Sequence, residues 1–417
     1  MTRGGFLFFV IPAKAGIQSF FVNGANCIGN NINLMDNMRV LISWHAATES
    51  LNRRLIAELV SKDVTIKAIV PKWWNEGSRK TVFEKQQYDN YEILSSPTIF
   101  TNHIRAFFYP NVLKIYREIA DFKPHIIHIM EEPFSFAAYE LIVISKLLKP
   151  RPRIILYSAE NIDFRQKFLY SYFQCSNLKN ADAIAVVPAE SVAIWQHRGF
   201  RKAIYTIPLG FDATLYEKNA EVKMPYLIRK AKDAFKIGYA GRITPEKGIE
   251  TVIRALSILK DRGKNCVFFI VGGGDHKNTL QNLISESGIN DLVHFLDAIS
   301  QNEMPAFYNS LDVFVLPSLT TDRWKEQFGR VLIESMASKT PVIGSSSGEI
   351  PRVIGNSGLV FKENDALQLA DSIQKLIDND ELRAELSKAG YKKVYENYTW
   401  SKVAESYIKA YKELLPI

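Results

Sequence analysis

From Met38 onward, short runs of β-branched and aromatic residues alternate with stretches whose apolar residues recur at helical spacing. The helical stretches span about 10 to 18 residues, the length expected of crossover helices between parallel strands. The pattern therefore predicts an α/β protein with two series of strands. The first series covers residues 39–43, 64–70, 125–130, 153–158, 183–187 and 203–208. The second covers residues 235–241, 266–274, 292–296, 312–317, 340–345 and 357–361.

A chain of 417 residues is too long for one compact domain, and its strands fall into two series. Residues 208–225, IPLGFDATLYEKNAEVKMP from Ile207 onward, contain proline, glycine and mixed charge with little periodicity, which predicts a linker. We expect an N-terminal Rossmann-like domain over residues 38–210 and a C-terminal one over residues 211–395. Apolar residues at helical spacing between Trp400 and Leu415 predict a final amphipathic helix within residues 396–417.

The first 37 residues have a different character. An apolar run and the tripeptide Ala13-Lys14-Ala15 imitate a signal peptide with a cleavage site, and the stretch then becomes rich in asparagine. Because a regular α/β pattern starts at Met38, we interpret residues 1–37 as a mistaken upstream extension or a disordered tail. A true signal peptide is the alternative. No later apolar run reaches the roughly 18 to 20 residues of a membrane-spanning helix.

The composition narrows the classes of partner. A net charge of +8 and a pI near 9.1 favour an anionic partner, although general solubility accounts for the excess equally well. Cys27, Cys175 and Cys266 lack the spacing of a zinc site or a disulfide framework, which fits a reducing compartment. We therefore expect no metal. Aromatic interleaving and known nucleic-acid-binding modules are absent from the sequence, so nucleic acid is not an expected partner.

Two loops that follow predicted strands of the second series carry candidate phosphate-binding residues. In the loop AGRITPEKGIE, Arg242 and Lys247 flank a turn, and Gly248 lets the backbone approach a ligand at a helix N-terminus. An arginine clamp and a mobile lysine suit a diphosphate, whereas solvated surface charges are the alternative. Gly272 begins a run of three glycines after the next strand, where the backbone can come close to a ligand. The spacing is not that of a dinucleotide fingerprint, which disfavours NAD.

Two glutamates eight positions apart, Glu326 and Glu334, flank a third candidate element. Phe328, Gly329 and Arg330 begin a predicted helix whose first N–H groups are free to bind a phosphate. Carboxylates on either side of that phosphate could each accept hydrogen bonds from vicinal hydroxyls. A nucleoside diphosphate sugar presents a ribose diol, a diphosphate and a hexose diol in that order. Favourable charge at a helix N-terminus could explain Glu326 alone, but it explains the pair poorly.

The combination of AGRITPEKG, VGGGD, DVFVLPS and EQFGRVLIE resembles the retaining GT-B glycosyltransferases of family 4, often called the glycosyltransferase group 1 family. The resemblance covers nearly the whole chain from Met38. It implies two Rossmann-like doubly wound domains facing across a cleft and a C-terminal helix that crosses back to the N-terminal domain. It also implies that Glu326 contacts the donor sugar, that Glu334 binds the ribose, and that Arg242 and Lys247 hold the diphosphate. The loop Gly348-Glu349-Ile350-Pro351 matches the family too and is expected to support the cleft wall.

The N-terminal domain departs from the family. Many relatives have a glycine pair after the first strand, where this chain reads Ser43-Trp44-His45. Many also have a histidine near the reacting centre, about where Glu131 stands here, beside Glu132. We therefore include Glu131 among the candidate catalytic residues. His45 and His128 are interpreted as structural, and Asn161 is a candidate that faces the cleft.

The resemblance implies transfer of a hexose from a nucleoside diphosphate sugar to an acceptor hydroxyl, with retention at the anomeric carbon and without a metal or other cofactor. The expected acceptor is a precursor of a cell-surface polysaccharide, a lipopolysaccharide or a lipid-linked glycan. A nucleotide-sugar epimerase on the same fold and a non-catalytic subunit are the alternatives. We expect a cytoplasmic protein. Its basic cluster Lys146, Lys149, Arg151 and Arg153 is interpreted either as a solvated helix end or as a contact with the inner face of the cytoplasmic membrane.

Overall fold

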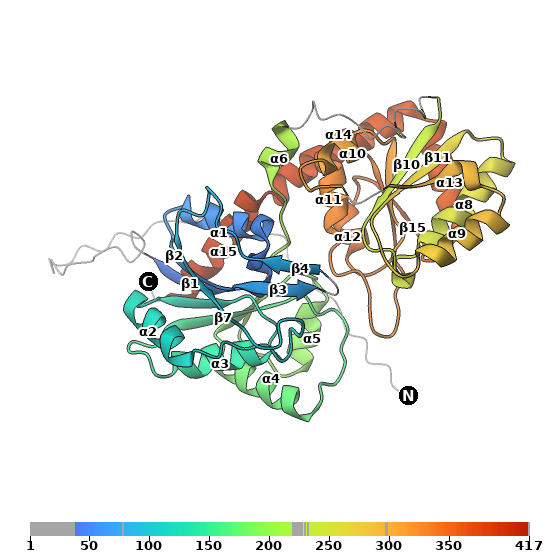
Figure 1. Ribbon diagram of the computed structural model, residues 1–417. Helices are drawn as coiled ribbons and strands as arrows, with labels where there is room; N and C mark the ends of the chain where they lie inside the picture. Colours follow the sequence, from blue (N-terminus) through green and yellow to red (C-terminus); the bar gives the residue numbers. More distant parts are fainter. Residues whose placement is uncertain are drawn as a thin grey trace, which may run out of the picture. The chain divides into compact units, whose positions relative to one another are not determined.

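The computed structural model describes residues 38–76, 79–218, 228, 231, 233–296 and 299–415 (Figure 1). The expectations for residues 1–37, and for residues 219–225 of the linker, fall outside the described residues. Two parallel sheets form the cores of an N-terminal and a C-terminal domain. The expectation of two doubly wound α/β domains is confirmed.

The seven-stranded sheet of the N-terminal domain has the strand order β5-β2-β1-β6-β7-β8-β9, and every neighbouring pair is parallel. Its strands are β1 (Arg39–Ser43), β2 (Thr65–Pro71), β5 (Glu92–Ser96), β6 (Ile126–Ile129), β7 (Arg153–Ser158), β8 (Ala183–Val186) and β9 (Ala203–Thr206). An antiparallel hairpin, β3 (Trp73–Glu76) and β4 (Arg79–Val82), follows β2.

Successive side chains of a strand point to opposite faces of the sheet, and the buried strands have apolar residues at both sets of positions. Both faces of the sheet are therefore apolar, and helices cover them. Val40 and Ile42 of β1 pack with α1 and the C-terminal helix α15, whereas Leu41 packs with the helices that cover the other face. The helical elements are η2 (His45–Thr48), η3 (Ser50–Asn52), α1 (Arg53–Val60), α2 (Val112–Phe122), α3 (Phe136–Ser145), α4 (Phe168–Asn180) and α5 (Ser191–His197).

The C-terminal domain contains a six-stranded parallel sheet with the strand order β12-β11-β10-β13-β14-β15. The strands are β10 (Phe235–Ala240), β11 (Cys266–Val271), β12 (Val293–Leu296), β13 (Val313–Leu316), β14 (Val342–Ser345) and β15 (Leu359–Phe361). The helical elements are α6 (Ala213–Lys218), η4 (Pro245–Lys247), α8 (Ile249–Asp261), α9 (Lys277–Glu286), η5 (Asn290–Leu292), α10 (Met304–Asn309), α11 (Arg330–Ala337), α12 (Ile350–Ile354), α13 (Ala366–Ile377) and α14 (Asp380–Asn397).

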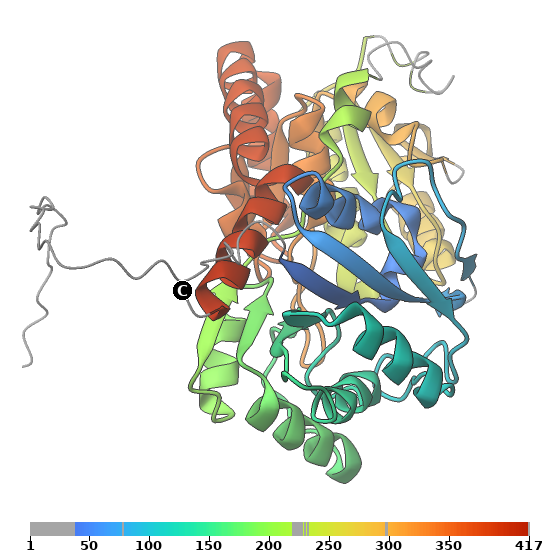
Figure 2. The same cartoon turned by 90° about the vertical axis from the view of Figure 1, so that its left-hand side faces the viewer.

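The last helix, α15 (Trp400–Leu414), returns to the N-terminal domain, as expected. Its buried face, which includes Trp400, Tyr407 and Tyr411, joins the apolar core shared by β1, β2 and α1. Figure 2 shows the red helix α15 against this domain, close to the blue helix α1. The Thr399 hydroxyl accepts a hydrogen bond from the Lys402 N–H and so caps the first turn.

Two segments that connect the domains run side by side. Phe211 donates its N–H to the Tyr398 carbonyl at 3.0 Å, and Trp400 donates its N–H to the Phe211 carbonyl at 3.1 Å. Phe211 and Thr399 form a parallel β-bridge. Gly210 fits here because a Cβ at this position would lie 2.4 Å from the Trp400 ring. The domains are therefore connected by a hydrogen-bonded pair of chains.

The observed elements differ from the predicted ones in three places. Strand β5, at the edge of the first sheet, and the β3–β4 hairpin were not predicted. The segment expected to be a linker contains α6, and its Asp212 carboxylate pairs with Arg54 at 3.0 Å. The proposed domain boundaries at 210/211 and 395/396 stay predictions.

The strand order determines where each sheet can hold a ligand. In the first sheet the order reverses between β1 and β6, and in the second between β10 and β13. Crevices open at the carboxyl ends of parallel strands at such switch points. The loops after β1 and β6 contain His45 and Glu131, and those after β10 and β13 contain Arg242, Lys247 and Glu326. These five candidate residues thus lie in loops at the two switch points.

Candidate active site

Glu326 lies in the loop between β13 and α11, and its side chain is buried. Its Oε2 accepts a hydrogen bond from the Lys247 ammonium at 2.7 Å and another from the Ser318 hydroxyl at 2.8 Å. Lys247 belongs to η4, which follows β10. The two loops at the second switch point are therefore joined through one carboxylate oxygen.

The two cations of the first loop differ in their surroundings. The Lys247 ammonium is partly neutralised by Glu326 and lies 4.5 Å from the centre of the Trp324 ring. Arg242 is exposed, and its guanidinium has no hydrogen-bond or ion-pair partner among the described residues. Arg242 is thus available for an anion, whereas Lys247 would have to share its protons between Glu326 and a phosphate.

Backbone contacts fix the position of the Glu326 loop. The Glu326 carbonyl accepts hydrogen bonds from the Asn161 side-chain amide at 3.0 Å and from the Glu349 N–H at 3.1 Å. Gly348 has a φ of +51°, and a Cβ there would lie 2.0 Å from this carbonyl. Asn161 comes from the N-terminal domain, so it supports the loop from across the cleft. The loop at Gly348 also contacts it, and the cleft-wall role that the family resemblance implies for this loop stays a prediction.

Helix α11 begins where the sequence predicted it. Gly329 precedes the first helical residue with a φ of +79°, a conformation that glycine adopts at little cost. Phe328 is buried and packs edge-on against Tyr398, with ring centres 5.7 Å apart. Arg330 reaches the N-terminal domain, where its Nη1 donates to Asn52 Oδ1 at 3.3 Å. The first turn of α11 therefore includes the Arg330 guanidinium, which contacts the N-terminal domain.

Glu334 lies one turn into α11 and is buried. Tyr308 donates its hydroxyl to Glu334 Oε2 at 3.0 Å, and Arg330 Nε lies 3.4 Å from Oε1. Burial raises the pKa of the Glu334 carboxyl, while Arg330 and Tyr308 oppose the rise. A ligand that donates hydroxyl protons to this carboxylate would stabilise its charged form.

Gly272 follows β11 with a φ of +137°, and a Cβ there would lie 1.9 Å from the Gly241 carbonyl oxygen. Ile243 N–H donates to the Gly273 carbonyl at 2.8 Å. The glycine run thus packs directly against the loop that contains Arg242. The structure gives Gly272 a role in shaping that loop, and ligand contact by Gly272 stays a prediction.

Glu131 contacts His45 by two hydrogen bonds. Its Oε1 accepts the His45 backbone N–H at 2.7 Å, and its Oε2 lies 2.5 Å from His45 Nδ1. The carboxylate is buried, whereas the His45 side chain keeps 21% of its surface exposed. A carboxylate only accepts hydrogen bonds, so His45 Nδ1 carries the proton and Nε2 is the ring atom left for other partners.

The His45 ring is further held by aromatic neighbours. Its centre lies 4.5 Å from that of Trp74 and 5.8 Å from that of Phe107. His45 lines a cavity of ≈ 490 Å³ that also contacts Thr48, Asn52, Gln301 and Arg330, which come from both domains. The interpretation of His45 as structural stays a prediction, and its place in the lining of this cavity makes it a candidate for ligand contact as well. A second cavity of ≈ 690 Å³ lies nearby, lined by Arg105, Arg165, Lys167, Tyr170 and Arg323.

His128 has a different environment. It is fully buried in β6, and its Nδ1 lies 2.8 Å from the Tyr411 hydroxyl of α15. Burial lowers the pKa of the imidazole to about 3, so the ring is neutral. This environment fits the structural role expected of His128.

Glu132 faces away from His45. Its Oε1 accepts the Ala159 N–H at 2.8 Å and its Oε2 the Ser158 hydroxyl at 2.7 Å. Burial raises the pKa of this carboxyl to about 8, and the nearby Glu160 and Glu131 carboxylates contribute to the rise. Glu132 is thus protonated in the folded protein near neutral pH.

Replacing Glu132 by glutamine is expected to flatten the dependence of stability on pH. Because the folded pKa lies above the unfolded value, the wild-type protein loses stability as pH rises from about 4.5 to about 8. At pH 8 the variant should be more stable by roughly 1–3 kcal/mol, and at pH 4.5 the difference should disappear. Urea unfolding at both pH values measures the free energy of unfolding of each protein. An equal difference in this free energy at pH 4.5 and pH 8 would contradict the raised pKa of Glu132.

Sequence reasoning missed several supporting residues. Ser318 lies in the quoted motif DVFVLPS, so its position after a strand was a usable signal. Tyr308 and Asn52 lie in segments without any motif and reach Glu334 and Arg330 only through the fold. The pairing of His45 with Glu131 joins residues 86 positions apart.

Several known proteins resemble this chain in sequence or in fold. Residues 227–393 match the sequence model described as "Glycosyl transferases group 1". The chain is 27% identical over 328 residues to the capsular polysaccharide biosynthesis glycosyltransferase CapM of Staphylococcus aureus, covering 74% of each chain. It is 31% identical over 182 residues to an uncharacterised glycosyltransferase of Methanocaldococcus jannaschii, covering 43% of this chain and 45% of that one. The chain spans about half the length of most of the curated relatives it matches.

The crystal structure of Anabaena HepE in complex with UDP matches with a TM-score of 0.67 and 14% identity, covering 90% of this chain and 100% of that one. The fold of the described chain is the GT-B fold of two Rossmann-like domains. Its C-terminal domain has the sequence pattern of group 1 glycosyl transferases. Among the described residues, no helix combines the length and the apolar character needed to cross a membrane.

Proposed function

We propose that the protein is a retaining glycosyltransferase of family 4 that transfers a hexose from a nucleoside diphosphate sugar to an acceptor hydroxyl. The observation that supports this most is the convergence of Lys247, Ser318, Glu326 and the start of α11 at the second switch point. Two carboxylates flank a helix N-terminus there, as a ligand with a diphosphate between two diols requires. The match of residues 227–393 to a glycosyl transferase family adds independent support.

In this proposal Arg242, Lys247 and the first N–H groups of α11 bind the diphosphate and stabilise the charge that develops on it as the sugar leaves. Phe328 and Gly329 form the helix start, Arg330 lies beside it, and Gly272 shapes the loop of Arg242. Glu326 Oε1 accepts hydrogen bonds from hexose hydroxyls, and Glu334 accepts them from the ribose. No metal or other cofactor enters the proposed reaction.

The proposal assigns different parts to His45 and Glu131. His45 lines the ≈ 490 Å³ cavity, and in this proposal its Nε2 would contact the sugar or the acceptor hydroxyl. Both oxygens of Glu131 contact His45, so Glu131 would act as a positioning residue that keeps the proton on Nδ1. This positioning role differs from the catalytic role that the sequence predicts for Glu131.

Glu131→Gln tests this assignment. A glutamine amide would donate to His45 Nδ1, which reverses the tautomer and places the proton on Nε2. We expect kcat to fall by about 10- to 100-fold and its pH profile to change. The control is Glu140→Gln, a buried carboxyl that accepts the Tyr109 N–H and does not contact His45. If both variants kept the wild-type pH profile, Glu131 would have only a structural role.

Glu334→Gln should weaken nucleotide binding more than it slows the reaction. The amide can still meet the Tyr308 hydroxyl, but it loses the charge that a ribose diol would hydrogen-bond. The affinity for UDP, or for whichever nucleoside diphosphate binds best, should fall by about tenfold, with kcat within about threefold of wild type. Isothermal titration and initial rates separate the two effects. Unchanged nucleotide affinity would refute the ribose assignment.

The proposed acceptor is a precursor of a cell-surface polysaccharide, a lipopolysaccharide or a lipid-linked glycan, met in the cytoplasm at the inner face of the membrane. The ≈ 690 Å³ cavity is lined by Arg105, Arg165 and Lys167, which suits an anionic acceptor. On the adjoining helix α4, Phe168 is 91% exposed and Leu169 is 55% exposed, so an apolar tail could lie against them.

The function is tested by incubating the protein with a panel of nucleoside diphosphate sugars, first alone and then with lipid-linked or water-soluble glycan acceptors. Release of the nucleoside diphosphate that depends on an acceptor, with a product of the donor's own anomeric configuration by NMR, is the expected result. Conversion of the donor without any acceptor would instead indicate an epimerase. Absence of turnover with every pair, together with absence of donor binding, would favour a non-catalytic subunit.

A further inference from the structure

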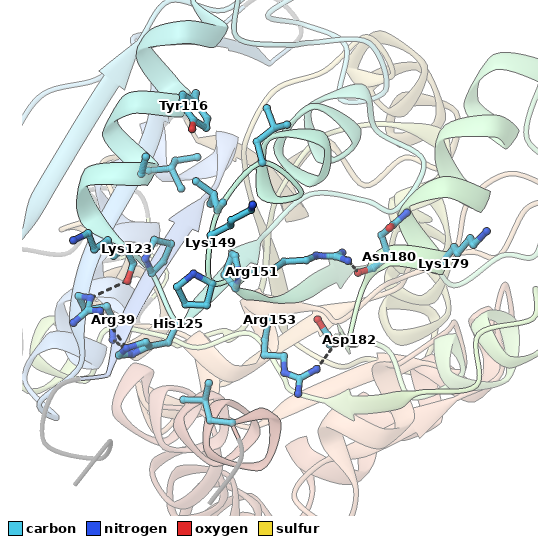
Figure 3. A pocket seen from close by; sticks show the side chains of 18 of the residues that line it. Arg39, Tyr116, Lys123, His125, Lys149, Arg151, Arg153, Lys179, Asn180 and Asp182 are labelled. Carbon is cyan, nitrogen blue, oxygen red and sulfur yellow. Dashed lines mark hydrogen bonds and ion pairs between the residues drawn. The ribbon is translucent and has the colours of Figure 1, made fainter. Parts of the chain in front are cut away.

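A large cavity lies at the end of the N-terminal sheet that is remote from the candidate active site. It has a volume of ≈ 860 Å³ and adjoins the starts of β1, β6 and β7, at Arg39, His125 and Arg153 (Figure 3). His45 and Glu131 follow the opposite ends of β1 and β6. Strands of four to six residues span about 13–20 Å at 3.3 Å per residue. The cavity is therefore separate from the cleft.

Positive charge dominates the lining of this cavity. Asp182 is the one carboxylate among its described lining residues. Both oxygens of Asp182 are occupied, one by Arg153 at 3.1 Å and the other by the Ile154 N–H at 2.8 Å. Six further cations line the cavity: Arg39, Lys123, Lys149, Arg151, Lys179 and Lys202.

The hydrogen-bond partners of these cations are neutral groups, so they do not neutralise the positive charge. Arg39 Nε donates to the Lys123 carbonyl at 2.9 Å, Arg151 donates to the Asn180 carbonyl at 3.1 Å, and Lys202 donates to the Ala181 carbonyl. Carbonyl groups orient a cation without neutralising it. By contrast, buried cations elsewhere in this domain contact carboxylates, as Arg53 does with Asp89 and Arg198 with Glu160. Mutual repulsion of the six cations would be relieved by a bound anion.

Two further features give the cavity a definite form. Lys123 occupies the left-handed position after α2, with a φ of +50°, where glycine is usual. Apolar side chains, including Leu147, Leu148 and Leu415, complete the walls. Lys123, Lys149, Arg151, Lys179 and Lys202 are exposed and Arg39 is half-buried, so the charged side of the cavity is open to solvent. The site combines a cationic rim with an apolar interior.

We propose that this cavity is a second ligand site, which binds an organic phosphate that carries an apolar group. The phosphate would meet the cations at the rim, and the apolar group would lie against Leu147, Leu148 and Leu415. Such a ligand is either the headgroup of an anionic lipid or a free phosphate ester. This inference does not depend on the proposed transferase activity. It also gives Lys149, Arg151 and Arg153 of the basic cluster a common site.

The experiment uses the full chain and two probes that share the glycerophosphate group. Isothermal titration measures binding of glycerol 3-phosphate, and co-sedimentation measures binding to phosphatidylcholine vesicles with and without phosphatidylglycerol. The variant is Lys149→Glu/Lys179→Glu, two exposed side chains whose replacement should leave the fold intact. The control, Lys85→Glu/Lys388→Glu, changes the net charge equally at exposed positions that do not line the cavity.

We expect binding of at least one probe by the wild-type protein and the control, and binding at least about tenfold weaker by the cavity variant. Binding of glycerol 3-phosphate identifies a free phosphate ester, whereas binding of phosphatidylglycerol vesicles alone identifies a lipid headgroup. UDP affinity should be equal in all three proteins. The proposal is overturned if neither probe binds, or if the cavity variant and the control bind equally well.

Discussion

Replacement of Glu326 by glutamine is expected to lower kcat by about 10²- to 10³-fold while the protein remains folded. Glutamine keeps the shape of the side chain and can still accept the Ser318 hydroxyl proton. It removes the negative charge that holds the Lys247 ammonium and that would bind the hexose hydroxyls. Because such contacts strengthen as charge develops on the sugar, the loss should fall on kcat more than on KM.

Initial rates with the best donor and acceptor measure this effect, and thermal unfolding reports whether the fold is intact. The matched control is Glu363→Gln. That carboxylate accepts the Thr320 hydroxyl at 2.8 Å beside the same loop, but it is only half-buried. We expect the control to keep its rate within about twofold. Wild-type kcat and KM in Glu326→Gln would refute the placement of the donor sugar at this carboxylate.

The second large effect is expected from Lys247→Ala, which should lower kcat/KM by about 10²- to 10³-fold. Lys247 contacts Glu326 at 2.7 Å and, in the proposed mechanism, shares its protons with the diphosphate. Its removal takes one cation from the phosphates and leaves the buried Glu326 without its ion-pair partner. Lys260→Ala, an exposed α8 lysine that donates to the Gly288 carbonyl, is the control.

The double variant Lys247→Ala/Glu326→Gln distinguishes one site from two independent ones. If the two side chains act as a unit, the fold-loss of kcat/KM in the double variant should be much smaller than the product of the fold-losses in the two single variants. We expect the two to differ by a factor of at least about ten. Losses that multiply would mean that the two side chains contribute separately. In that case the observed hydrogen bond would not bear on catalysis.

Most of the fold could be predicted from the sequence because its strands are buried on both faces. Such strands form continuous β-branched and apolar runs, and all twelve predicted runs contain an observed strand. Strand β5, with the sequence EILSS, lies at a sheet edge and begins with an exposed glutamate, so it has no such run. The β3–β4 hairpin contains two adjacent tryptophans and mixed charges and gives no period-2 signal.

The candidate site was predictable only where a local motif encodes it. Glu326, Glu334, Arg242 and Lys247 lie in segments whose residue types and spacing indicate a diphosphate between hydroxyl groups. Contacts between distant side chains have no such trace in a single sequence. Glu131 was singled out for its position, but its hold on His45 depends on β1 and β6 being neighbours across the switch point.

The paired segments that join the domains restrict how those domains can move. A single flexible connection would allow rotation about several axes. Here Phe211 is hydrogen-bonded between Tyr398 and Trp400, and the Trp400 ring packs against Gly210. Twisting one domain relative to the other would shear these bonds, whereas flexing perpendicular to the pair would preserve them. Two hydrogen-bonded connections should therefore resist twisting between the domains more strongly than a single connection would.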